Sequence, residues 1–233
     1  GTNQAYVWRS GVKHDCSKIM ELTKVSGDVF SNGFGEKVSL ECDIVFPLLK
    51  SSDVAKGRTE TDRYMIVTQR EIGEDTAPLE ARVPRTWKYL LDHADVLDAR
   101  GSVIYRGKSR FSVFGVGSYT YAPWKVAISG FYKSVNFMKV GPQGDKPVVF
   151  DDTVYFLPCY SEAEADFVMA LVKSGPYREL IASIIFSDEK RPVTAELLKR
   201  ISLEKVADVL GMSEQYAAFT GHAVKPQLKL AFG

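Results

Sequence analysis

The segment Trp124-Lys125-Val126-Ala127-Ile128-Ser129 decides the fold class, together with Thr153-Val154-Tyr155-Phe156-Leu157 further along the chain. Both segments are rich in β-branched and aromatic residues and lie between turn-forming residues, a pattern typical of strands. The same pattern predicts four more strands nearby, at residues 103–105, 111–116, 137–140 and 148–150. The middle of the chain is therefore expected to be a β-sheet.

Helices are expected to follow this sheet. Ser161 and Glu164 have the spacing of a capping box, which predicts an amphipathic helix reaching about Lys173. Apolar spacing and caps predict further helices at residues 177–185, 194–200 and 203–210, a last turn at 213–219 and a loose tail at 224–233.

The first hundred residues give a less regular pattern. We expect strands at residues 5–9 and 64–68, an amphipathic piece at 19–22, and a strand or short helix at 38–46 that ends at Pro47. Ser51-Ser52-Asp53 is typical of a turn. Pro84 is placed to begin a helix whose apolar positions continue to Leu97.

The combined pattern predicts an α+β fold with a central mixed or antiparallel β-sheet and helices gathered toward the C-terminus. We expect two parts, a β-rich domain at residues 1–160 and a helical extension at 161–233 that packs on it. The boundary near Tyr160 rests on this change of pattern, because no low-complexity linker marks it.

Composition limits the class of protein. The 233 residues are 45% hydrophobic, enough to bury a sizeable core. No stretch reaches the roughly 18 uninterrupted apolar residues of a membrane span, and Gly1-Thr2-Asn3-Gln4 has no signal-peptide features. We therefore expect a cytoplasmic protein. Because the chain does not begin with Met, we also expect it to be part of something longer.

The sequence offers few catalytic or metal-binding motifs. Its three cysteines include no CxxC pair, and it has neither a GxSxG nor an HExxH motif. Asp151 and Asp152 would face opposite ways on a strand, which disfavours a shared metal ion. Asp188-Glu189-Lys190 is a blurred version of the acidic-plus-lysine set of metal-dependent nucleases. We expect a binding protein with no catalytic residues and no bound metal, and a nuclease is the least favoured alternative.

Charge is distributed unevenly. The chain has a formal net charge of +1, yet residues 100–144 hold seven cations and no Asp or Glu. The remaining residues therefore sum to −6, so the basic block is a local feature that favours an anionic partner. The seven cations are Arg100, Arg106, Lys108, Arg110, Lys125, Lys133 and Lys139.

The cations at residues 106–110 are followed by stretches 119–125 and 131–134, in which aromatic residues alternate with cations. Lysine and arginine neutralise phosphates, and aromatic or small polar side chains contact bases, so the combination is typical of nucleic-acid binding. An alternative stays open, in which the aromatics are core residues of a sheet and the lysines its solvated edge.

Several stretches resemble the region that follows the catalytic domain in adenine methyltransferases of bacterial restriction-modification systems. The resemblance extends to about Leu203. It is carried by Asn3–Cys16, Phe46-Pro47-Leu48-Leu49-Lys50-Ser51-Ser52-Asp53-Val54, Ile66–Gln69, Phe111-Ser112-Val113-Phe114-Gly115-Val116-Gly117, Ala122–Gly130, Asp151–Phe156 and Arg191–Thr194.

The resemblance implies a DNA target-recognition domain. In that family a methylase domain in the same polypeptide uses S-adenosylmethionine to methylate the exocyclic amino group of adenine. A region like this one reads the double-stranded DNA sequence, and the target base is flipped out of the stack. The glycine-rich cofactor turn and the Pro-Pro loop of the methylase domain are absent from this sequence, so no catalytic residue is carried over and no cofactor is expected here.

Under this hypothesis the basic strands and loops bind DNA. The candidate contacts are Arg106, Lys108, Arg110, Lys125 and Lys133, with Tyr119, Tyr121 and Ser129 as additional ones. Gln69 and Arg70 are further candidates, because glutamine suits adenine and arginine suits guanine. In the alternative hypothesis the same basic, aromatic surface docks the methylase domain or a restriction subunit.

Overall fold

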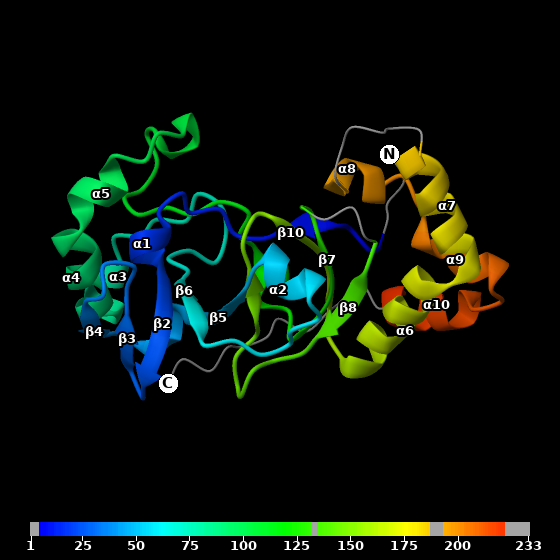
Figure 1. The fold of residues 1–233 in the computed structure, drawn as a ribbon, viewed down its shortest axis with the longest axis horizontal. Helices are drawn as coiled ribbons and strands as arrows, with labels where there is room; N and C mark the ends of the chain where they lie inside the picture. The colour runs from blue at the N-terminus through cyan, green and yellow to red at the C-terminus, as the bar shows by residue number, and fades with distance from the viewer. Residues whose placement is uncertain (1–4, 132–134, 187–192, 222–233) are drawn as a thin grey trace.

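The computed structural model describes residues 5–131, 135–186 and 193–221. It has two β-sheets side by side and a group of helices at one end, so the predicted α+β class is confirmed (Figure 1). Within the described ranges, no helix is long and apolar enough to cross a membrane.

The larger sheet has six strands in the order β4-β3-β2-β6-β5-β9. Its neighbours pair antiparallel, except that β5 and β9 pair parallel, so the sheet is mixed. The strands are β2 (Glu21–Ser26), β3 (Val29–Ser31), β4 (Lys37–Ser39), β5 (Val45–Leu49), β6 (Arg63–Ile66) and β9 (Val149–Phe150).

The smaller sheet is antiparallel, in the order β1-β10-β7-β8. Its strands are β1 (Arg9–Ser10), β7 (Trp124–Ser129), β8 (Phe137–Val140) and β10 (Val154–Cys159). The two central strands, β7 and β10, are the segments whose composition predicted a sheet. Both are almost entirely buried, which explains their near-continuous apolar sequence.

Short helices cover the outer end of the larger sheet and the connections between strands (Figure 1). They are α1 (Ser17–Met20), η1 (Cys42–Ile44), α2 (Ser51–Ala55), α3 (Leu79–Arg82), α4 (Pro84–Asp92), α5 (Ala94–Asp98), η2 (Val103–Tyr105) and η3 (Ser118–Tyr121).

The C-terminal helices pack on the smaller sheet as α6 (Glu162–Lys173), α7 (Gly175–Phe186), α8 (Ala195–Leu198), α9 (Leu203–Val209) and α10 (Ser213–Thr220). The predicted cap is confirmed, since the Ser161 hydroxyl accepts from the Glu164 amide at 3.1 Å. Tyr6 and Trp8 pack into this helical cluster, so the N-terminal segment belongs to the core of the C-terminal part. A domain boundary near Tyr160 stays a prediction.

Several local predictions were wrong. Residues 103–105 form a 3-10 turn, and residues 111–116 contribute only an isolated bridge between Phe114 and Lys13. Buried Phe111 has φ +63°, a conformation that interrupts a strand. Of residues 5–9 only Arg9 lies in a strand.

Polar side chains account for other differences. Ser51-Ser52-Asp53 begins α2 instead of forming a turn, because an Asp53 carboxylate oxygen accepts from the Lys50 amide at 3.0 Å. The helix predicted from Pro84 is broken between α4 and α5. At the break, Nδ1 of His93 donates to the Tyr89 carbonyl at 2.8 Å. In a continuous helix the backbone amide of His93 would donate to that same carbonyl, so the side chain replaces the helical hydrogen bond. Strand β5 continues through Pro47, where its pairing changes from β6 to β9.

Two glycines bring three distant segments into backbone contact. A Cβ at Gly11 would lie 2.1 Å from the Asp151 carbonyl oxygen, and one at Gly115 would lie 2.3 Å from the Gly11 carbonyl oxygen. The amides of Gly11 and Val12 donate to carbonyls of Val154 and Phe150. The N-terminal segment is therefore held between the β9–β10 turn and the loop around Gly115.

We predict that Gly115→Ala destabilises the protein far more than Gly144→Ala. Both glycines have φ near +65°, which costs an alanine about 1–2 kcal/mol, but Gly144 has open space around it. Gly115→Ala adds a clash with backbone and should lower the free energy of unfolding by at least about 3 kcal/mol. Chemical denaturation of the two variants measures this difference, and equal losses would contradict it.

Candidate functional site

In Figure 1 the dark-blue segment that contains β1 lies between the loop after α5 and helix α8. Residues of these three parts of the chain line a groove of about 610 Å³. We call the part of the groove around β1 its floor, and it is lined by Arg9, Gly11, Lys13, Tyr119 and Asp152. Ile72, Ile104 and Phe114 line one side, and Ala195, Glu196 and Lys199 of the α8 region line the other. The groove thus collects residues from widely separated parts of the chain.

The floor carries an ordered cation. The guanidinium of exposed Arg9 lies over the Tyr119 ring, with its central carbon 4.6 Å from the ring centroid. Tyr119 packs in turn against buried Phe156. Gly117 makes room for the tyrosine, because a Cβ there would come within 2.5 Å of the ring. Burial raises the pKa of Tyr119, although nearby Arg9 opposes the shift, so the phenol stays neutral.

One side of the groove continues into the basic loop of residues 100–110. Arg100 anchors this loop by donating to the carbonyls of Ser112 and His14, and its guanidinium stacks 3.8 Å from the centroid of Tyr105. Burial raises the pKa of Tyr105 to about 12. Beyond this anchor, Arg106 and Lys108 are exposed and have no ion-pair partner among the described residues.

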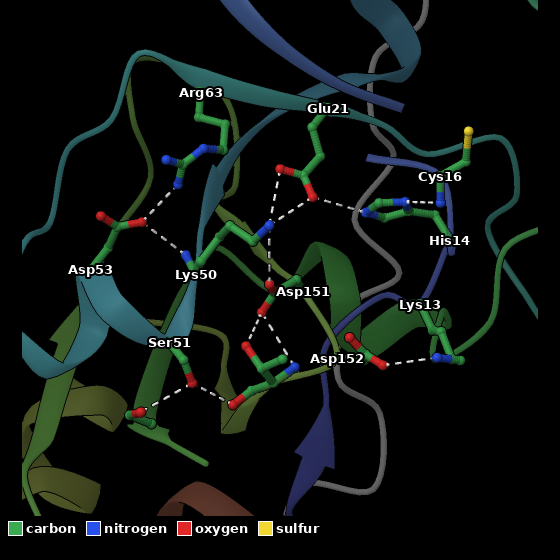
Figure 2. A network of polar contacts seen from close by, with 12 residues as sticks. Lys13, His14, Cys16, Glu21, Lys50, Ser51, Asp53, Arg63, Asp151 and Asp152 are labelled. Carbon is green, nitrogen blue, oxygen red and sulfur yellow. Dashed lines mark hydrogen bonds and ion pairs between the residues drawn. The ribbon is translucent and has the colours of Figure 1, made fainter. Parts of the chain in front are cut away.

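A network of polar side chains lies next to the groove, and its members Lys13 and Asp152 also line the groove (Figure 2). Nζ of Lys50 donates to both carboxylate oxygens of Glu21, at 2.8 and 3.1 Å, and lies 3.7 Å from Asp151. Nε2 of His14 lies 3.3 Å from Glu21, and Nδ1 accepts the Cys16 amide, which places the proton of a neutral ring on Nε2. The network ties strands β2 and β5 to the turn before β10.

The two carboxyls of this network respond differently to burial. Burial alone would raise the pKa of Glu21, but hydrogen bonds from His14 and Lys50 overcome that effect and lower it. Burial raises the pKa of Asp151 despite its hydrogen bonds with Thr153 and the nearby Lys50. His14 and Lys50 therefore together keep Glu21 ionised inside the protein.

The network has no arrangement typical of metal binding or catalysis. Among the described residues, no group of three or more His, Cys, Asp or Glu side chains could hold a metal ion. A lysine ammonium occupies the space between the two carboxylates (Figure 2). The ion pairs and hydrogen bonds of the network instead connect strands β2 and β5 to the turn before β10.

Comparison with known proteins gives one sequence relative of note. The chain is similar to a Type II methyltransferase. This relative is M.NspV from Nostoc sp. (strain ATCC 29411 / PCC 7524), which is 47% identical over 211 residues. The match covers 90% of this chain and 44% of the relative, so the chain spans less than half of that protein's length. No family model matches the sequence.

Among solved structures, the fold resembles part of the Type IIL restriction-modification enzyme MmeI in complex with DNA. The TM-score is 0.42 at 10% sequence identity, over 95% of this chain and 36% of the enzyme.

The structure separates the candidate DNA contacts into exposed and buried groups. Arg106, Lys108, Arg110 and Arg70 are exposed, and Tyr119 is partly exposed on the groove floor. Arg110 pairs with Asp98 at 2.8 Å, which neutralises part of its charge. Lys133 lies outside the described residues, as does the Asp188-Glu189-Lys190 set.

Four candidates are interior side chains, which removes them as DNA contacts in this conformation. Lys125 is 1% exposed, and its ammonium donates to the Ala122 carbonyl. The Tyr121 hydroxyl donates to the backbone carbonyl of Gln69. The side-chain amide of Gln69 accepts from the Val113 amide and donates to the Glu74 carbonyl. The Ser129 hydroxyl donates to Ser51. Burial of these polar groups is tolerated because each forms a hydrogen bond with another group inside the protein.

The sequence reasoning missed Arg9 and Lys199 as groove residues. Arg9 stands in one of the quoted family-like stretches, which is the signal that could have pointed to it. Lys199 gave no signal, because only the folded chain brings α8 opposite residue 104.

We predict that Lys50→Met destabilises the protein by about 1–3 kcal/mol, since it leaves Glu21 and Asp151 without their cation in a half-buried site. Lys88→Met, which removes an exposed ion pair with Asp92, should cost less than about 0.5 kcal/mol. Denaturation at neutral pH measures both. Since the folded pKa of Glu21 is depressed, the Lys50 contribution is full above the unfolded pKa and is lost as pH falls through the folded one. A pH-independent cost would contradict the ionic role.

We predict that Lys125→Met stabilises the protein at pH 7, by on the order of 2 kcal/mol. Burial lowers the pKa of Lys125 to about 7, so the unfolded chain holds more protons between that value and the ordinary lysine pKa. The wild type therefore gains stability as pH rises from 7 to about 10, and the advantage of methionine should shrink over that range. Thermal melting at both pH values checks this, and an advantage that grows with pH would refute it.

Proposed function

We propose that this chain is the target-recognition region of an adenine-specific DNA methyltransferase of a restriction-modification system, and that it binds double-stranded DNA without performing chemistry itself. The 47% identity to a Type II methyltransferase carries the proposal. A longer polypeptide would supply the methylase domain, as the relative is more than twice as long as the matched region.

Within the described ranges, the glycines at 33, 115 and 117 do not form a turn of the kind that binds S-adenosylmethionine. A cofactor turn of this kind needs glycines that open a helix, whereas Gly115 and Gly117 lead into the four-residue 3-10 turn η3. Gly33 packs against the backbone of Lys18. Cofactor binding and methyl transfer would therefore belong to the methylase domain.

The geometry supports a division of labour within the groove. Arg106 and Lys108 lie on the loop that follows groove residue Ile104, and Lys199 lines the groove beside Glu196, so each of these segments offers a cation to a bound duplex. Such side contacts would neutralise phosphates and fix the register of the DNA. The floor residues would then face the base edges.

A docking function is the second candidate. Ile72 and Val103 are 58% and 65% exposed near the same side of the groove, and exposed apolar residues beside cations also suit a protein interface. In this case the partner would be the methylase domain or a restriction subunit. Salt separates the two functions, because phosphate contacts weaken steeply with salt and an apolar interface does not.

The test is fluorescence anisotropy of the chain on a mixed-sequence duplex at about 50 and 200 mM salt. We expect salt-dependent binding by the wild type. Arg106→Ala/Lys108→Ala should bind more weakly, and its slope of log affinity against log salt should be smaller by about 2.

The matched control is Lys37→Ala/Lys205→Ala, which removes the same charge from exposed positions outside the groove. It should bind like the wild type. Equal loss in both double variants would mean that net charge alone governs binding. Absence of binding at low salt would refute DNA recognition by this chain and favour the docking function.

A further inference from the structure

We infer that Arg9 reads the edge of a guanine base in DNA bound in the groove. This inference deepens the proposed function and rests on it. Arg9 differs from the other groove cations in its place and its restraint, and its hydrogen-bond donors are available.

The place of Arg9 favours a base over a phosphate. Arg9 lies on the groove floor in β1, whereas Lys199 lies on one side and the Arg106 loop continues the other. The phosphates of a duplex held between two sides lie toward those sides, and the base edges of the groove facing the protein lie toward the floor. A cation on the floor is therefore placed for base recognition.

The guanidinium is also restrained before any ligand arrives. The central carbon of the guanidinium lies 4.6 Å from the centroid of the Tyr119 ring. That ring packs against Phe156 and fills the space that a side chain at Gly117 would occupy. Stacking holds the plane of the guanidinium and leaves its edge free for hydrogen bonds. A restrained fork loses less entropy on binding than a flexible lysine.

The donors of Arg9 have no acceptor among the described residues. No carboxylate forms an ion pair with it there, in contrast to Arg110 with Asp98 and Lys13 with Asp152. A guanidinium with a planar pair of N–H donors matches the O6 and N7 acceptors of guanine in the major groove. A phosphate would also match the positive charge of Arg9, but binding a phosphate would not require a guanidinium held in a fixed position on the groove floor.

The experiment selects bound duplexes from a randomised DNA library and sequences them, for the wild type, Arg9→Lys, Arg9→Ala and Tyr119→Leu. We expect the wild type to favour guanine at one position by about 10- to 100-fold. Arg9→Lys should lose that preference while keeping the salt dependence of binding, because it keeps the charge and loses the fork. Tyr119→Leu should weaken the preference, because the guanidinium loses its support.

Substitution of 7-deazaguanine at the preferred position, which removes the N7 acceptor, should lower the affinity of the wild type and leave Arg9→Ala unaffected. Thermal melting of each variant shows whether it is folded before it is compared.

Three results would overturn the inference in different ways. If Arg9→Ala weakens binding to all sequences equally and lowers the salt slope by about 1, Arg9 contacts a phosphate. If the guanine preference survives in Arg9→Ala, another residue reads that base and the proposed function stands. If the wild type binds no DNA at low salt, the proposed function fails and this inference fails with it.

Discussion

Close backbone contact at Gly11 and Gly115 is the constraint on which the rest of the structure depends. The carbonyl of Gly11 occupies the space that a side chain at residue 115 would fill, and Gly11 itself lies against the Asp151 carbonyl. Any larger residue would separate the N-terminal segment, the β9–β10 turn and the loop before η3. The groove floor exists because these three segments meet without side chains between them.

The charged network next to the groove lies at the same meeting point of segments (Figure 2). Lys50 follows β5, Glu21 begins β2 and Asp151 precedes β10, so one ammonium group links elements more than a hundred residues apart. Buried ion pairs add little net stability compared with apolar packing, but breaking one is costly. Such a network favours one arrangement of the two sheets over alternatives in which a carboxylate would be buried alone.

The sequence predicted those elements whose signals are local. Strands β7 and β8 and helix α6 were predicted with their observed bounds, because composition and the Ser161 cap act within a few residues. The stretch at residues 111–116 looked equally β-like, but distant partners decide its conformation. The Thr68 hydroxyl donates to the carbonyl of Phe111, and Gln69 accepts from the Val113 amide.

The candidate site shows the same limit. Arg106 and Lys108 could be found from charge, since the basic block has no acidic residue. Charge alone could not separate them from Lys125, because the burial of a lysine depends on which sheet covers it. Lys199 could not be found either, since its place opposite residue 104 is a property of the tertiary structure.

Alternation along the N-terminal segment has a consequence for how such a protein could change. Trp8 is buried in the helical cluster, and the next residue, Arg9, is exposed in the groove. Neighbouring side chains on an extended chain point to opposite sides, so residue 8 is constrained by core packing and residue 9 by the surface of the groove. A substitution at residue 9 changes the side chain that lines the groove and leaves the packing of Trp8 intact. One position can therefore diverge quickly between descendants of a common ancestor while the adjacent codon stays under selection for folding.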